Sequence, residues 1–159
     1  MANPYDYLKA ISQVERAHSQ FLDVVKLELD GLGIYDINNV QALMLFNIGT
    51  AKLSMGELTL RGCYHGSNSS YNTKKLVENG YLTQERSPHD RRSILVRLTK
   101  KGVRLRDQLM TMHQRHLALL AHTALTDEEL GAATATLDLL ERIWSRAGDL
   151  MERAAAHAA

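Results

Sequence analysis

Residues 80–102 read GYLTQERSPHDRRSILVRLTKKG. The runs at 81–86 and 94–98 are typical of β-strands, and the second of them alternates weakly between apolar and polar residues. Residues 87–90, Ser-Pro-His-Asp, lie between the two runs and supply the side chains that favour a turn. Two arginines follow the turn directly, so this stretch predicts a β-hairpin with a basic tip.

Four helices are predicted before the hairpin. Apolar residues from Tyr7 to Leu29 recur at spacings of three, four or seven, which is typical of one stripe of a long amphipathic helix. Ser54 and Glu57 have the spacing of a capping box, in which each side chain bonds the backbone amide of the other residue. We expect the four helices at about residues 5–30, from Asp36 or Asn38 to Gly49, from Ser54 to Gly62, and over 67–79.

Two further helices are predicted after the hairpin. The first runs from Thr99 and ends before Thr126, and Thr126 with Glu129 forms a second capping box that opens the last helix. Three short helices followed by a hairpin predict a winged helix-turn-helix, in a mainly α fold with a small β-hairpin wing. We expect an N-terminal dimerisation helix at 1–35, a DNA-binding lobe at 36–100 and C-terminal dimerisation helices at 101–159, in one continuous globular unit.

Charge is distributed unevenly along the 159 residues, although the formal net charge is only +1. Residues 61–106 hold eleven Lys and Arg against three Asp and Glu, a net charge of +8, whereas the remaining residues hold eight basic and fifteen acidic side chains, a net charge of −7. A basic middle between acidic helical ends indicates a polyanion-binding module on a scaffold that does not touch the polyanion. The alternative is an ordinary solvated charged face.

Several function classes are excluded by the sequence. One cysteine cannot form an intramolecular disulfide or a zinc site built on two or four cysteines, and it fits a reducing compartment, so we expect a cytoplasmic protein. No apolar stretch approaches eighteen residues, and the N-terminus lacks the features of a signal peptide, so we expect no membrane association. The absence of a G-x-S-x-G elbow, a P-loop, a G-x-G-x-x-G motif and an H-E-x-x-H motif argues against an enzyme, and we expect no cofactor.

The helix at 67–79 is the candidate recognition helix, because the second helix of a helix-turn-helix enters the major groove. If Leu76 and Val77 face the core, steps of 100° per residue place Ser69 and Thr73 on the same side. An ordinary solvated helix face would have a similar composition. The outward set is polar, basic and aromatic: Asn68, Ser70, Tyr71, Lys74 and Lys75.

The sequences at 80–82, 90–93 and 96–102 together resemble the wing signature of the MarR family of bacterial transcriptional regulators. The resemblance implies a homodimer that binds double-stranded DNA, with two recognition helices that read the halves of a palindromic operator. It implies that Arg92 enters the minor groove beside Arg91, and that Asp90 is the salt-bridge partner of Arg92. Asn68, Ser70, Tyr71 and Lys75 match the positions that contact bases and phosphates, with Lys74 beside them.

The same resemblance implies an interface and a form of control. We expect dimerisation through the terminal helices, on stripes that include Tyr7, Ile11, Leu137, Leu140 and Trp144. We expect a repressor that a small aromatic or anionic effector releases from DNA, with effector-binding residues that the sequence does not identify. A winged-helix protein-interaction module or antirepressor without specific DNA binding is the alternative. With its glycine-flanked turn at 61–66, the sequence resembles an alphaproteobacterial branch of the family, which includes regulators of cell-wall transpeptidase genes.

Three features have two interpretations each. Cys63 precedes the recognition helix and is either an oxidant sensor or a small half-buried apolar residue. His113 and His116, one turn apart, share a metal with His18 or serve in interface packing; we expect no metal site. Trp144 and the N-terminal aromatic residues line an effector pocket or fill the dimer core.

Overall fold

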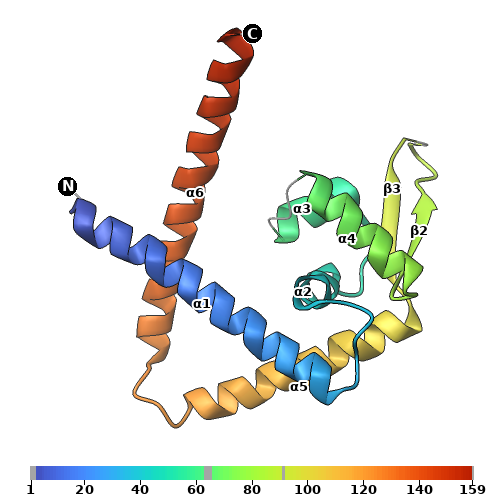
Figure 1. Ribbon diagram of the computed structural model, residues 1–159, viewed down its shortest axis with the longest axis horizontal. Coiled ribbons are helices and arrows are strands. Elements are labelled where there is room, and N and C mark those ends of the chain that lie inside the picture. The colour runs from blue at the N-terminus through green and yellow to red at the C-terminus, as the bar shows by residue number, and fades with distance from the viewer. Residues whose placement is uncertain (1–2, 63–65, 91, 159) are drawn as a thin grey trace. The chain divides into compact units, whose positions relative to one another are not determined.

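The computed structural model describes residues 3–62, 66–90 and 92–158 (Figure 1). The chain divides into two compact units, Met1–Gln114 and Arg115–Ala159. In chain order the elements are α1 (Pro4–Gly31), α2 (Asn39–Ile48), β1 (Leu53–Ser54), α3 (Met55–Gly62), α4 (Gly66–Glu78), β2 (Leu82–Arg86), β3 (Ile94–Leu98), α5 (Lys100–Leu120) and α6 (Asp127–Ala158).

Local side-chain chemistry sets the start of α2. The side chain of Asn38 accepts a hydrogen bond from the Gln41 backbone amide at 2.8 Å, and the side chain of Gln41 accepts one from the Asn38 backbone amide at 3.0 Å. This reciprocal pair satisfies two amides that the helix itself leaves without partners. Gly49, with φ of 66°, ends the helix as the sequence predicts, because a residue without Cβ adopts this conformation at little cost.

Both predicted capping boxes are confirmed. The Glu57 carboxylate accepts hydrogen bonds from the backbone amide and the hydroxyl of Ser54, at 2.7 and 2.8 Å, directly before α3. At the start of α6 the Glu129 carboxylate accepts the backbone amide of Thr126 at 2.9 Å, and these bonds lower the pKa of Glu129. The hairpin strands differ from the predicted ranges by at most one residue.

A third strand, β1, was not predicted. The sheet has the order β1-β3-β2, with both pairs antiparallel, and β1 joins it through the pairs Leu53↔Val96 and Ser54↔Leu95. Two residues are too few to show a period-two pattern, so only their pairing with β3 identifies them as a strand. Leu53, Leu82 and Val96 are all buried, and they anchor the base of the hairpin.

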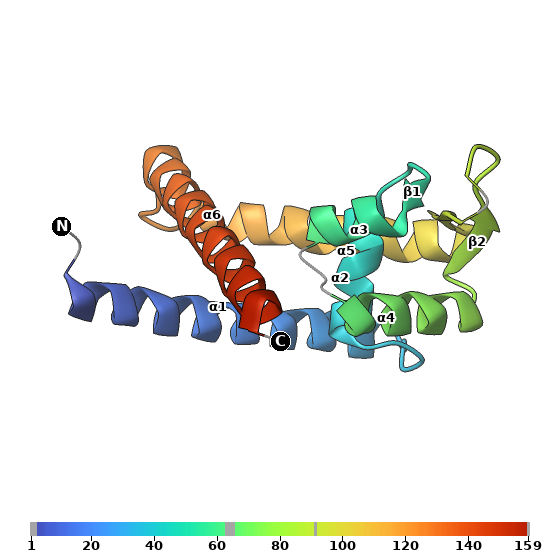
Figure 2. The same cartoon turned by 90° about the horizontal axis from the view of Figure 1, so that it is seen from above.

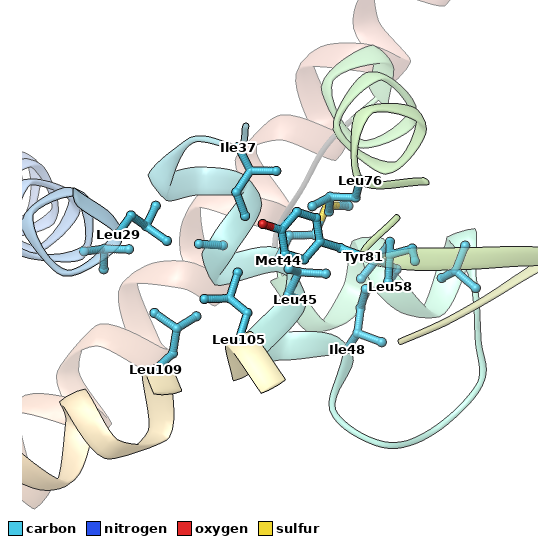
Figure 3. Close-up of a cluster of buried hydrophobic side chains, with 14 of the residues drawn as sticks. Leu29, Ile37, Met44, Leu45, Ile48, Leu58, Leu76, Tyr81, Leu105 and Leu109 are labelled. Carbon is cyan, nitrogen blue, oxygen red and sulfur yellow. The ribbon is translucent and has the colours of Figure 1, made fainter. Parts of the chain in front are cut away.

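One core fills the unit of residues 1–114 (Figure 3). Its members come from every helix from α1 to α5 and from all three strands; the largest include Leu29, Met44, Leu58, Leu76, Tyr81, Leu105 and Leu109. Because Leu29 of α1 and Leu105 of α5 help to fill it, the C-terminal part of α1 and the first half of α5 are packed into the lobe that holds α4 and the hairpin. The predicted limits of that lobe at 36 and 100 remain a prediction.

Candidate nucleic-acid interface

The predicted recognition helix and wing lie side by side in the structure. Helix α4 contacts β2, and Figures 1 and 2 show α4 next to the β2–β3 hairpin. Gly80, with φ of 75°, makes the turn between them, and the Tyr81 backbone amide donates to the Leu76 carbonyl oxygen at 2.9 Å. The turn therefore fixes where the hairpin leaves the helix.

The burial of α4 follows the predicted helical faces. Ser69, Thr73 and Leu76 are buried, at 2%, 4% and 0% exposure. The side chains predicted to face outward are exposed or half-buried: Asn68, Ser70, Tyr71, Lys74 and Lys75. The inward and outward faces are thus confirmed, and the DNA-binding role of the outward face remains a prediction.

An acidic residue holds the two lysines of α4. The Lys75 ammonium lies 2.9 Å from the carboxylate of Glu78, and the Lys74 ammonium lies 3.9 Å from it. The hydrogen bond from Lys75 lowers the pKa of the Glu78 carboxyl, and the same bond raises the pKa of Lys75. Glu78 is therefore the acidic neighbour of both lysines on this helix.

Asp90 binds two backbone amides at the wing tip. Asp90 Oδ1 accepts a hydrogen bond from the Arg92 backbone amide at 2.9 Å, and the Asp90 carbonyl oxygen accepts one from the Ser93 amide. Among the ion pairs of the described residues, none joins Asp90 to the Arg92 guanidinium, and their salt bridge in a DNA complex remains a prediction. A carboxylate two residues before an amide reaches that amide more easily than the end of a long side chain. The Arg92 side chain is exposed, and Arg91 lies outside the described residues.

Further basic residues lie along the hairpin. Arg86 of β2 and Arg97 of β3 are exposed. Glu85 of β2 is paired with Lys52, which directly precedes β1, at 2.5 Å, and this hydrogen bond lowers the pKa of Glu85. Lys52 therefore ties the edge of the sheet to the wing.

A polar cluster that no sequence pattern predicts lies at Asp36, Tyr81 and Lys101. The Asp36 carboxylate accepts hydrogen bonds from the Tyr81 hydroxyl and from the Lys101 ammonium, both at 2.8 Å. Lys101 also donates to the Asn79 carbonyl oxygen at 3.0 Å and lies 4.0 Å from the centre of the Tyr81 ring. The cluster joins the α1–α2 loop to the α4–β2 turn and to the first turn of α5.

The pKa of Asp36 is lowered in this cluster, and the pKa of Tyr81 is raised. Burial raises the pKa of Asp36, but the hydrogen bonds from Lys101 and Tyr81 outweigh it, so the pKa of Asp36 is lowered overall. Burial and the bond to Asp36 raise the pKa of the Tyr81 phenol, which keeps that hydroxyl a donor. Hydropathy and periodicity carry no signal for this cluster, because its members are up to 65 positions apart.

A groove lies beside α4 within the same unit. Its volume is about 410 Å³, and its lining includes two cations and two aromatic rings: Lys26, Tyr35, Tyr71 and Lys75. The rest of the wall consists of Ile34, Asp36, Ile37, Asn38 and Gln41. Tyr71 and Lys75 therefore face both the groove and the exposed side of α4.

The candidate dimer residues are only partly covered in the single chain. On α1, Tyr7 is 39% exposed and Ile11 is half-buried; on α6, Leu137 is 48% exposed, Trp144 is 37% exposed and Leu140 is half-buried. Among the α6 side chains described, through Met151, none is buried. Long helices with apolar residues left at the surface need another surface to cover them.

His113, one of the candidate metal ligands, lies next to two aromatic side chains. The centre of the His113 ring lies 5.9 Å from the centre of the Phe21 ring and 4.8 Å from that of the Phe46 ring, so His113 packs among aromatic side chains. Within the described ranges, no three His, Cys, Asp or Glu side chains converge as metal ligands. Cys63 lies outside the described residues.

No helix in the described part of the chain has the length and apolar character needed to span a bilayer.

Known proteins with similar sequences are DNA-binding transcriptional regulators. Residues 37–102 match the family described as winged helix DNA-binding domain. The chain is 38% identical over 141 residues to the exopolysaccharide II synthesis transcriptional activator ExpG of Rhizobium meliloti, covering 89% of this chain and 73% of that protein.

Solved structures share the fold at low sequence identity. A Staphylococcus aureus MarR in complex with salicylate and kanamycin superimposes with a TM-score of 0.69 at 19% identity, over 90% of this chain and 95% of that one. Streptococcus pneumoniae FabT in complex with DNA superimposes with a TM-score of 0.69 at 18% identity, over 88% of this chain and 98% of that one. The shared architecture extends beyond the winged helix to nearly the whole chain.

Proposed function

This chain belongs to the winged helix transcriptional regulators of MarR type, and on that basis we propose that it binds a palindromic operator as a homodimer. The regulators of this family and fold are DNA-binding proteins rather than enzymes. Helix α4 would read bases in the major groove, and the β2–β3 wing would contact the adjacent minor groove.

One observation carries the proposal: an exposed polar and basic helix face lies next to an exposed arginine at a hairpin tip. Tyr71 is 58% exposed and the Lys74 side chain 76% exposed, while Arg92 is exposed beyond a turn that Asp90 closes. Buried hydrogen bonds and apolar contacts hold the helix and the hairpin together at Tyr81. A polar helix face beside a basic wing supports the proposal, because such a helix fits the major groove and an arginine can enter the minor groove.

Dimerisation is the second part of the proposal. The apolar residues left at the surface of α1 and α6, Leu137 and Trp144 among them, support a second copy as their cover. A two-fold dimer places the recognition helices on successive turns of DNA, about 34 Å apart. Tyr7, Ile11 and Leu140 belong to the same proposed interface.

Release by a small aromatic or anionic effector is the third part. The groove beside α4 supports it, because Lys26 and Lys75 offer positive charge and Tyr35 and Tyr71 offer ring surfaces. An occupant of this groove would contact two residues of the proposed DNA-binding face. Salicylate, which the S. aureus MarR structure contains, is a suitable first probe.

We propose that the protein represses its target genes. A protein that occupies a promoter excludes RNA polymerase without any further contact, whereas activation needs an additional surface. The name of ExpG, a transcriptional activator, makes activation the second candidate. A promoter fusion in cells with and without the intact gene separates the two, since deletion raises expression under repression and lowers it under activation. The transpeptidase-gene branch remains a prediction that the same target-gene experiment tests.

The experiment for DNA binding is fluorescence anisotropy with the protein's own upstream region and a scrambled duplex of equal length, at two salt concentrations. We expect preference for the upstream duplex and a steep loss of affinity with salt, because phosphate contacts release counterions. A fragment selected from random DNA provides the operator if the upstream region lacks it. If no sequence is preferred over the scrambled duplex in either format, the chain is a winged-helix protein-interaction module and the proposal is wrong.

A further inference from the structure

Helix α4 is held to the core by few apolar side chains. Leu76 is fully buried, but the two preceding positions on the same face are Thr73 and Ser69, 4% and 2% exposed. Their hydroxyl groups have no hydrogen-bond partner among the residues that the structure describes. Hydroxyl groups bury less apolar surface than aliphatic side chains, and unpaired polar groups oppose burial. Apolar packing therefore specifies the rotation of α4 about its axis only weakly.

A hydrogen bond between Gln41 and Asn72 restricts the rotation of α4. Gln41, in the first turn of α2 and only 5% exposed, donates from Nε2 to Oδ1 of Asn72 in the middle of α4, at 3.1 Å. Its Oε1 accepts the Asn38 backbone amide at 3.0 Å. Both ends of the Gln41 amide are engaged, so its orientation is fixed. One buried side chain thus links the start of α2 to the recognition helix.

The position of Asn72 makes this link relevant to base reading. Asn68 lies four residues before it and Lys75 three residues after it, so all three share one flank of α4. A hydrogen bond weakens steeply as its distance and angle change. Rotation of α4 that moved this flank relative to the DNA would break the bond between Gln41 and Asn72.

We propose that Gln41 is a positioning residue for sequence recognition: through Asn72 it fixes the rotation of α4 and so selects which bases this helix face contacts. The inference rests on the proposed DNA-binding function. It concerns discrimination between sequences rather than total affinity, because lysine and arginine contacts to phosphates carry no sequence information. A buried polar bond that specifies one arrangement has precedent in other folds.

The test compares the single variants Gln41→Met and Asn72→Ala, the double variant, and Gln108→Met as a control on the exposed surface of α5. The probes are the duplex that the wild-type protein enriches from random DNA and a scrambled duplex of equal length. The ratio of the two Kd values is measured by anisotropy, with a thermal unfolding curve for each variant. Asn72→Ala leaves the α2 capping box intact, so a loss of stability confined to Gln41→Met would be due to the lost cap rather than to the lost bond between Gln41 and Asn72.

We expect each single variant to lower the discrimination ratio by about fivefold to tenfold, with the double variant no worse, because both changes remove the same bond. Affinity for the scrambled duplex should change by less than about twofold, since the phosphate contacts remain. Gln41→Glu should restore discrimination: its carboxylate accepts the Asn38 amide and, once the Asn72 amide has turned, accepts from Asn72 as well.

Three results would overturn the inference. A lower Tm with an unchanged ratio in both single variants would show a merely structural role. Loss of discrimination in Asn72→Ala alone would show that Asn72 contacts DNA directly and owes nothing to Gln41. If the wild-type protein enriches no sequence, the proposed function fails and this inference fails with it, whereas the first two results leave the proposed function intact.

Discussion

The Lys101 ammonium lies 2.8 Å from the Asp36 carboxylate, although 65 positions separate the two residues in the chain. Asp36 belongs to the loop between α1 and α2, and Lys101 to the first turn of α5. Tyr81, at the base of the wing, donates to the other carboxylate oxygen. The ion pair and the Tyr81 hydrogen bond together join three segments at the point where the hairpin leaves the core.

Asp36→Asn should lower stability in a pH-dependent way. The folded pKa of Asp36 lies below its ordinary value of 3.8, so ionised Asp36 stabilises the fold at pH above that value, and the stabilisation is lost as pH falls through the folded pKa. Because the side chain is 42% exposed, we expect a loss of only about 0.5–1 kcal/mol at pH 7. Urea unfolding at pH 7 and pH 3 measures it, with exposed Asp23→Asn as control. An equal loss at both pH values would contradict the assignment.

Gly102→Ala should destabilise the same region by steric overlap. A Cβ atom at Gly102 would overlap the Tyr81 carbonyl oxygen and lie 3.1 Å from Leu98 Cδ2. The Tyr81 oxygen is backbone and also accepts the Thr99 amide, so it cannot move freely. We expect a loss of about 1–3 kcal/mol, measured by urea unfolding.

The matched control for that change is Gly131→Ala on α6. Nothing lies within 4 Å of a Cβ at Gly131, so alanine should raise stability by about 0.5–1 kcal/mol through its better helix propensity. Equal effects at the two glycines would mean that the contact between α5 and Tyr81 is not tight.

Glu78→Gln should strengthen DNA binding. The change removes the carboxylate that pairs with Lys75 and Lys74 and that would repel phosphate. We expect affinity to rise roughly twofold to fivefold at low salt, on specific and scrambled duplexes alike, and less at high salt. Anisotropy titrations measure it, with Glu128→Gln on α6 as control. Unchanged or weaker binding would place the C-terminal half of α4 away from the DNA backbone.

Arg92→Ala should weaken operator binding by about 1–3 kcal/mol, provided that its guanidinium is desolvated in a groove. The side chain is exposed, and Asp90 binds the Arg92 backbone amide in the turn. Arg16→Ala on the exposed surface of α1 is the control. Identical operator affinity of the Arg92 variant and wild type at moderate salt would show that the wing does not enter the minor groove.

Leu140→Asp should yield monomers that bind the operator poorly. Leu140 is half-buried on the α6 stripe, and a charge there would be buried in the proposed interface. Light scattering coupled to size-exclusion chromatography measures the mass. Ala135→Asp, on the opposite side of α6, should leave the dimer intact. A dimeric Leu140 variant would place the interface on another face.

Helix α4 shows how far the sequence alone predicts the candidate site. Leu76 as an inward anchor was enough to place Ser69 and Thr73 inside and Tyr71 outside, because the helical period relates neighbours rigidly. That the two buried hydroxyls find no partner among the described residues depends on what packs against them, which no local pattern contains. The same holds for Asp90, whose carboxylate accepts a hydrogen bond from the backbone amide of Arg92.

Local chemistry in the sequence determined the helix ends, the hairpin and the two faces of α4, because caps, turns and periodicity act between residues a few positions apart. The tertiary structure alone decided that Leu53 and Ser54 form a strand, that Lys101 meets Asp36, and that Gln41 holds Asn72. Those contacts join residues 31 to 65 positions apart or depend on a partner strand, and only the closing of the core brings their atoms within hydrogen-bonding distance.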